Sequence, residues 1–265
     1  MNLAFLDPYR ERDSAIHALD ARLKLVVAVV MMLIISVTPI TSWEAHALYV
    51  AALMALTALS RVSLRHILGR SMIVLPFVLM AAIGLPFVRE GAAIASVQLP
   101  WTRVTVTDVG MLRFATVMVR GWLSLLVAVV LVSTTPFVEI ARALRLLGVP
   151  DILTSVIMLM YRYIFVLVDE AQRLMRAREA RSTETPGRRA GRSMLWRARV
   201  TGRMIGSLFI RTYERSERIY QAMLARGYDG AFRTLRPSRP ISRRQVAVGG
   251  VGLSAMALAA LLASL

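Results

Sequence analysis

Five long apolar stretches constrain the fold of this chain more than any other feature. A helix needs roughly 17 to 25 mostly apolar residues to cross the hydrocarbon core of a bilayer. The stretches that meet this requirement are Leu25–Thr41, Trp43–Ser60, Met72–Val88, Phe114–Val132 and Val246–Leu265. They predict an all-α membrane protein with about five transmembrane helices.

The remainder of the chain is strongly basic. Its 265 residues include 33 basic and 16 acidic side chains, and Lys24 is the one lysine among the basic residues. No glycine-rich stretch precedes that lysine, so a phosphate-binding loop of the GxxxxGK[ST] type is excluded. The absence of cysteine excludes disulfides, thiolate metal sites and cysteine nucleophiles. Any ATP-driven work would therefore need a partner that hydrolyses the ATP.

Loop charge predicts the orientation, because cytoplasmic loops collect Lys and Arg. The loop Arg61–Arg70 has three arginines and no acid, which places it and the amino terminus inside. A sixth apolar stretch, Ile152–Val168, contains Arg162. If it crossed the membrane, it would export residues 169–245, which hold 19 arginines against seven acids. We therefore expect this stretch to lie at the cytoplasmic interface or to pack against another membrane protein.

Three regions follow from this topology. Residues 1–133 are predicted to form a transmembrane region with four helices, 134–245 a cytoplasmic coupling-helix domain, and 246–265 a final transmembrane helix whose end lies outside. In the outer loop, Ser96–Thr107 alternates like a pair of strands. Arg120, inside the fourth predicted span, is an intramembrane charge and hence of functional interest.

The cytoplasmic part is predicted to be helical. An amphipathic helix over Phe137–Leu147 should end at Gly148 and Pro150, and a second should run from Asp151 to about Arg181. A third, about Arg197–Leu224, should end at a cap formed by Gly227. It carries an apolar stripe at helical spacing: Ile205, Leu208, Phe209, Ile219, Tyr220 and Met223. The stripe is either the core of a helix hairpin or a docking surface, and both interpretations stay open.

Several motifs, in order along nearly the whole chain, resemble a known family. They are LDARLK at 19–24, LGVP at 147–150, YRYIFVLVDEA at 161–171, REARS at 178–182 and AMLARGYDG at 222–230. The chain resembles the transmembrane T component of energy-coupling factor (ECF) transporters, and within that group the CbiQ-type metal branch. The resemblance implies a non-catalytic subunit of an ATP-driven importer, in the inner membrane of a bacterium, that carries cobalt or nickel ions.

The resemblance also implies partners and docking residues. Two cytoplasmic ATP-binding cassette ATPases resembling CbiO would bind two short triplets, Ala180-Arg181-Ser182 and Ala225-Arg226-Gly227. A substrate-binding membrane subunit resembling CbiM, with or without a small CbiN-like protein, would contact the apolar stripe. The first triplet has Ser182 where the family commonly has glycine. The arginine of each triplet could bind a carboxylate of an ATPase, because a guanidinium group forms two parallel hydrogen bonds with a carboxylate.

Other sites are weakly indicated. The three histidines, His17, His46 and His66, lie in different segments without ligand spacing, so no metal site, cofactor or catalytic residue is predicted. The basic run at 188–203 favours attraction to anionic membrane lipid over nucleic-acid binding. The alternative function is a membrane-embedded enzyme that uses this basic region for an anionic lipid substrate.

Overall fold

The computed structural model of the chain describes residues 14, 16–17, 19–39, 42–87, 93–98, 103–181, 194–230 and 243–262. The chain divides into two compact units: Met1–Leu147 together with Ser238–Leu265, and Gly148–Pro237. The predicted boundaries at residues 134 and 246 divide membrane segments from cytoplasmic segments, whereas the two units divide the chain by packing. The structure therefore does not test these boundaries, and they stay predictions.

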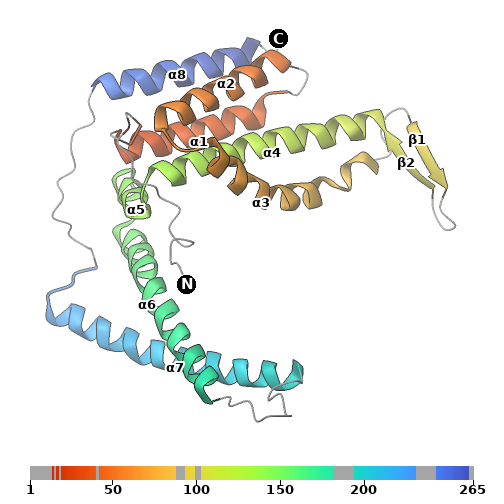
Figure 1. Cartoon of the computed structure of the whole chain (residues 1–265). Coiled ribbons are helices and arrows are strands. Elements are labelled where there is room, and N and C mark those ends of the chain that lie inside the picture. Colours follow the sequence, from red (N-terminus) through yellow and green to blue (C-terminus); the bar gives the residue numbers. More distant parts are fainter. Residues whose placement is uncertain are drawn as a thin grey trace. The chain divides into compact units, whose positions relative to one another are not determined.

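The first unit is a set of packed helices with one small hairpin. In Figure 1, α8 lies beside α2 and α1, and α4 runs along α1 and α3. Strands β1 and β2 pair antiparallel, which confirms the strand pair predicted for the outer loop. The elements are α1 Ala21–Val37, α2 Trp43–Ser60, α3 Leu64–Ala82, the 3-10 helix η2 Leu85–Phe87, β1 Ala93–Gln98, β2 Arg103–Thr107, α4 Asp108–Thr134, α5 Phe137–Leu146 and α8 Arg243–Leu262.

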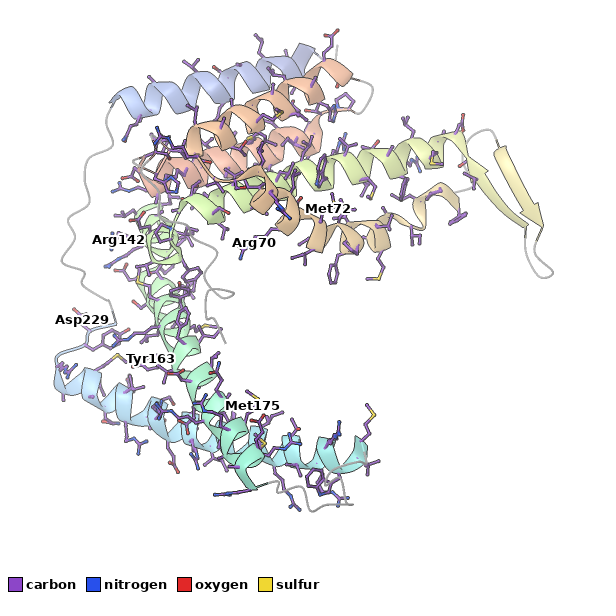
Figure 2. All side chains as sticks on the ribbon, in the orientation of Figure 1. Arg70, Met72, Arg142, Tyr163, Met175 and Asp229 are labelled. Carbon is purple, nitrogen blue, oxygen red and sulfur yellow. The ribbon has the colours of Figure 1, made fainter. Side chains whose placement is uncertain are left out.

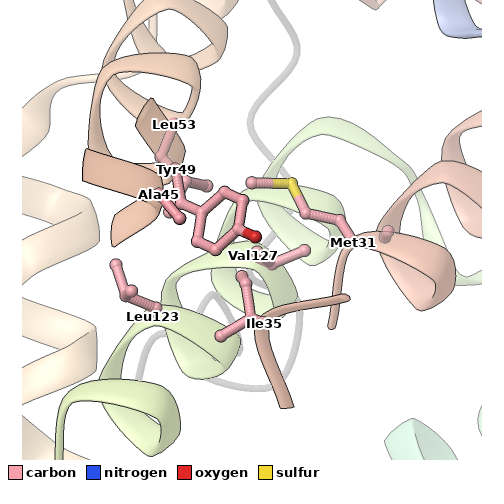
Figure 3. Packing of buried hydrophobic residues seen from close by; sticks show 8 residues of the cluster. Met31, Ile35, Ala45, Tyr49, Leu53, Leu123 and Val127 are labelled. Carbon is pink, nitrogen blue, oxygen red and sulfur yellow. The ribbon is translucent and has the colours of Figure 1, made fainter. Parts of the chain in front are cut away.

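The core of this unit lies where α1, α2 and α4 meet. Tyr49 of α2 is fully buried, and its ring lies among apolar side chains of all three helices (Figure 3). Its neighbours in this cluster include Met31, Ile35, Ala45, Leu53, Leu123 and Val127. Helix α8 approaches α1 closely at Gly249, where an added Cβ would lie 3.1 Å from Leu23 Cδ1. Glycine at that position lets the two helices pack together.

Polar groups inside the first unit bond to one another. The Tyr49 hydroxyl lies 2.8 Å from Thr38 Oγ1, which also donates to the carbonyl of Ile34. Arg120 Nη2 of α4 donates to the Thr38 carbonyl at 2.5 Å. Near the other end of α1, the buried Lys24 ammonium donates to the carbonyl of Thr134 at the last residue of α4. These bonds fix the two ends of α1 on α4 and satisfy groups that would be costly to bury alone.

The second unit consists of two long helices, α6 Asp151–Arg181 and α7 Met194–Ala225. Both agree with the predicted helices, and α6 ends at the predicted residue. The end predicted for the preceding helix is confirmed as well, because α5 stops at Leu146 and Gly148 takes a positive φ of 100°. Glycine accepts this left-handed conformation without the steric cost that a side chain adds.

The start of α3 differs from the prediction. The sequence indicated a loop over Arg61–Arg70, but α3 begins at Leu64 and includes both Arg65 and Arg70. The loop is therefore short. Counting apolar residues misses the first two turns of α3 because Arg65, His66 and Arg70 interrupt their apolar residues.

Among the described residues, three helices are long and apolar enough to cross a membrane: Ile67–Phe87, Asp108–Thr134 and Asp151–Arg181. The first of these overlaps the predicted third span except for Val88, which lies outside the described residues, and the second contains the predicted fourth span. Shorter apolar helices overlap the second predicted span at Glu44–Ser60 and the first half of the fifth at Gln245–Ala255, and α1 has 17 residues. The all-α membrane fold is thus confirmed, while the count of five spans and the interfacial position of 152–168 stay predictions.

Candidate docking site at the ends of two helices

The first docking triplet lies at the carboxyl end of α6. Ala180 and Arg181 are the last two residues of that helix, and both are exposed to solvent. Ser182 lies outside the described residues. The small side chain of Ala180 leaves the guanidinium of Arg181 accessible at the helix end.

The second triplet is built into the cap of α7. Gly227 has a φ of 79°, the amide of Tyr228 donates to the carbonyl of Met223 at 3.0 Å, and the amide of Gly227 donates to that of Leu224 at 2.9 Å. This pair of bonds is a Schellman motif, and it makes Arg226 the C-cap residue. The glycine cap predicted at this position is confirmed. Ala225, Arg226 and Gly227 are all exposed, so the cap presents the arginine at a defined point where the helix ends.

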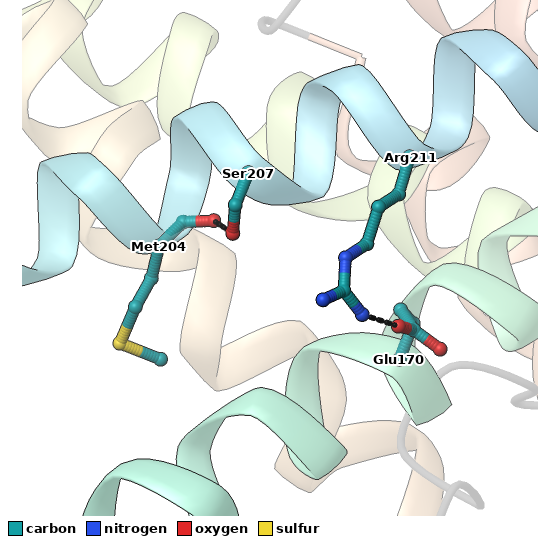
Figure 4. Close-up of polar contacts among 4 residues, drawn as sticks. All are labelled: Glu170, Met204, Ser207 and Arg211. Atoms are coloured by element: carbon teal, nitrogen blue, oxygen red, sulfur yellow. Dashed lines mark hydrogen bonds and ion pairs between the residues drawn. The ribbon is translucent and has the colours of Figure 1, made fainter.

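Side-chain contacts between the described parts of α6 and α7 include an ion pair and a cation–π contact. Arg211 Nη1 of α7 donates to Glu170 Oε1 of α6 at 3.0 Å (Figure 4). Further along, the guanidinium of Arg178 lies 6.0 Å from the ring centroid of Trp196. The two contacts are eight residues apart on α6 and fifteen apart on α7, in reverse order along the chain, so the last part of α6 crosses the first half of α7 (Figure 1).

This pairing separates the two docking arginines. Arg181 ends α6 three residues after Arg178, whose partner Trp196 lies at the start of α7. Arg226 lies at the other end of α7, about 45 Å from Trp196 along the helix axis at 1.5 Å per residue. Two separate protein partners can therefore bind the chain at the same time, one at each arginine.

The side chains of the apolar stripe on α7 differ in their exposure to solvent. Leu208, Ile219 and Met223 are half-buried, whereas Ile205 is 61% exposed, Phe209 68% and Tyr220 49%. Exposed apolar side chains in this number on one helix are typical of a surface that another molecule covers. Within the described residues nothing buries Ile205, Phe209 or Tyr220, so a hairpin core does not account for the whole stripe.

The two histidines whose side chains are described bond to different neighbours. His17 Nδ1 lies 2.7 Å from Ser14 Oγ, and the buried His46 places Nδ1 2.9 Å from the Ser42 carbonyl. His66 belongs to α3, but its side chain lies outside the described set. Among the residues that the structure describes, no three His, Cys, Asp or Glu side chains form a group that could hold a metal ion.

Two contacts between helices were not predicted from the sequence. The Arg211–Glu170 pair spans 41 residues and the Arg120–Thr38 bond spans 82. Glu170 had no predicted role. Neither contact follows from helical spacing, because each joins two different helices.

The pattern of one protein family, CbiQ, described as cobalt transport protein, matches residues 12–237 of the chain. This match covers both docking triplets and the apolar stripe. The chain belongs to the CbiQ family. Its membership disfavours the alternative of a lipid-modifying enzyme, since the family is one of non-enzymatic transporter membrane subunits.

Named relatives agree with membership in the CbiQ family. The chain is 28% identical over 156 residues to the cobalt transport protein CbiQ of Rhodobacter capsulatus, covering 59% of this chain and 61% of that protein. It is 29% identical over 229 residues to the energy-coupling factor transporter transmembrane protein EcfT of Limosilactobacillus fermentum, covering 82% and 81%. A fused cobalt transport protein CbiMQ of Methanocorpusculum labreanum is 35% identical over 102 residues, covering 38% and 16%.

The chain spans less than two thirds of the length of several of the relatives that it matches. The chain spans 61% of the R. capsulatus protein and 41% and 37% of two uncharacterized proteins of Methanocaldococcus jannaschii.

Proposed function

We propose that this chain is the transmembrane coupling subunit of an ATP-driven ECF-type importer for cobalt or nickel ions. In this role it links two cytoplasmic ATPase subunits to a substrate-binding membrane subunit. The ECF assignment is supported by the likeness to EcfT over 82% of the chain. The metal assignment is supported by the family description and by the CbiQ relative.

The observation that carries the proposal is the pair of exposed Ala-Arg ends on α6 and α7. Each arginine offers a fork of N–H donors that fits a carboxylate or a set of backbone carbonyls on an ATPase. Because the arginines lie at opposite ends of the α6–α7 pair, each serves one ATPase. When ATP binding draws the two ATPases together, the helix ends move with them, and α6 and α7 transmit the motion.

The exposed part of the apolar stripe receives the substrate-binding subunit. Ile205, Phe209 and Tyr220 present large apolar surfaces that gain free energy when a partner removes them from water, at about 25 cal/mol per Å². A CbiM-like subunit is the partner we propose, and the fused CbiMQ relative supports such a pairing by its name. The coupling helices lie on the cytoplasmic side of the inner membrane in this proposal, because of their arginine excess.

Substitution of Arg226 by glutamate tests the docking role. In a co-purification of the whole complex from membranes, we expect Arg226→Glu to lose the ATPases while the chain still inserts. Truncation of one partner of a desolvated charge pair costs about 2 to 5 kcal/mol, and reversal of the charge costs at least as much. The matched control is Arg218→Glu, an exposed arginine on the same helix outside the triplet. Retention of the ATPases and of metal uptake by Arg226→Glu would refute the proposal.

A further inference from the structure

A third side of α7, distinct from the apolar stripe, combines arginines with exposed apolar residues. Leu195, Arg199, Arg203, Gly206 and Ile210 follow one another at intervals of three or four residues, so they share one side of the helix. All five are exposed. We name these residues the basic side of α7.

Helix α6 leaves the basic side open. The α7 residues that are half-buried on the α6 side are Val200, Met204 and Ser207, which lie between those of the basic side in the sequence. Arg211 joins them through its ion pair with Glu170 (Figure 4). The basic side is exposed and faces away from these residues. Figure 2 shows side chains projecting from α7 on more than one side of the helix.

Charge is distributed unevenly along α7. Residues 194–211 contain four arginines and no acidic residue, whereas residues 212–225 contain two arginines and two glutamates. The apolar residues are also concentrated at the start of the helix, where Met194 is 89% exposed, Leu195 73% and Trp196 41%. The first half of α7 is thus both cationic and apolar, and the second half is neutral overall.

This combination is the pattern of a helix that lies in a membrane interface. Arginines bind lipid phosphates, while Leu, Ile and Trp side chains enter the boundary between headgroups and acyl chains. We propose that the basic side of α7 binds anionic phospholipid headgroups at the membrane surface, with Arg199 and Arg203 as the phosphate ligands. This function goes beyond the proposed coupling role and uses different residues from the docking triplets.

A lipid surface fits these residues better than an acidic protein or a nucleic acid. An acidic partner would pair with Arg199 and Arg203 but would leave Leu195 and Ile210 without an apolar environment. A purely apolar partner would desolvate both arginines without supplying a counter-charge. An anionic bilayer surface supplies both environments at the depth that each side chain requires.

Brominated lipids give a direct test in the full-length chain, which contains no cysteine of its own. A bimane label is placed on Leu195→Cys, and, as a matched control, on Gln221→Cys, an exposed position on the neutral half of the same helix. Each labelled chain is reconstituted in phosphatidylcholine bilayers containing either brominated phosphatidylglycerol or brominated phosphatidylcholine. We expect stronger quenching of the Leu195 label by the brominated anionic lipid at equal mole fraction, and no such preference at Gln221.

Removal of the arginines tests which side chains bind the headgroups. We expect Arg199→Gln with Arg203→Gln to weaken the association with the anionic lipid about thirtyfold, since each arginine near an anionic surface strengthens binding by a factor of about five. Arg215→Gln with Arg218→Gln, the same change in charge on the second half, should leave the preference intact.

Equal quenching by the two brominated lipids would overturn the proposal, as would no quenching at Leu195. Quenching that is present in the isolated chain but absent in the complete complex would also overturn it, because a protein partner would then occupy the basic side. Loss of ATPase binding by Arg226→Glu bears only on the coupling role, so the two proposals fail separately.

Discussion

Thr38 and Tyr49 satisfy each other inside the helix bundle of the first unit. Thr38 is 1% exposed and Tyr49 is fully buried, and 2.8 Å separates their hydroxyl oxygens. Thr38 donates to Ile34, so the Tyr49 hydroxyl is the donor to Thr38. The same residue accepts from Arg120 through its carbonyl. Thr38 therefore connects α1, α2 and α4 through three polar bonds.

Replacement of Tyr49 by phenylalanine removes one of these bonds without changing the packing of the ring. We expect Tyr49→Phe to lower the free energy of unfolding by about 1 kcal/mol, because one acceptor position of Thr38 is left unsatisfied in the interior. Unfolding by denaturant in detergent micelles measures the change. Tyr220→Phe, the same substitution at a half-exposed position, is the control and should have no effect. Equal stability of both variants and the parent chain would contradict the role of the Tyr49 hydroxyl.

At the scale of a helix, the end of α7 depends on one glycine. Nothing lies within 4 Å of the position that a Cβ on Gly227 would take, so space does not require glycine there. The requirement comes from φ, which at 79° lies in the left-handed region. A side chain in that region costs roughly 1 to 2 kcal/mol. The C-cap position of Arg226 is held by this glycine.

Alanine substitutions at Gly227 and at Gly206 show whether the backbone conformation or the available space requires glycine at the end of α7. We expect Gly227→Ala to loosen the last turn of α7, with amide hydrogen exchange around Met223 and Leu224 about five- to tenfold faster. Gly206→Ala is the matched control. Gly206 also has open space around it but is helical, so alanine should stabilise α7 by up to about 1 kcal/mol. Identical exchange in the two variants would show that the cap does not hold the end of α7.

The elements that were predictable from the sequence are those with local causes. The ends of α5 and α7 follow from Gly148 and Gly227, and the hairpin follows from alternation in the chain. The start of α3 at Leu64 was missed because Arg65, His66 and Arg70 interrupt the apolar residues of its first turns. Contacts between helices, such as Arg211 with Glu170, depend on how two distant segments pack, and no local spacing encodes that. The positions of the docking arginines on their helices were thus predictable, but their separation was not.

At the scale of the whole molecule, the apolar length of α6 and the charge of the chain that follows it favour different membrane topologies. By length and composition Asp151–Arg181 is apolar enough to cross a membrane. Crossing would carry the 19 arginines and seven acids of residues 169–245 to the outer side. Positively charged segments near a span resist export, although long segments do so less strongly than short ones. The exposed apolar residues in its first half, Ile152, Leu153, Val156 and Met160, must then be covered by the interface or by another membrane protein.

Labelling of single cysteines from one side of the membrane distinguishes these arrangements. The two positions are Met111→Cys, exposed at the start of α4, and Gln221→Cys, exposed on α7. We expect a membrane-impermeant maleimide to label Met111→Cys in intact spheroplasts and Gln221→Cys only after permeabilisation. Labelling of Met111→Cys shows that the reagent reaches outer sites, so protection of Gln221→Cys is meaningful. If Gln221→Cys reacts in intact spheroplasts, α6 crosses the bilayer, and the docking arginines face away from every ATPase in the cytoplasm.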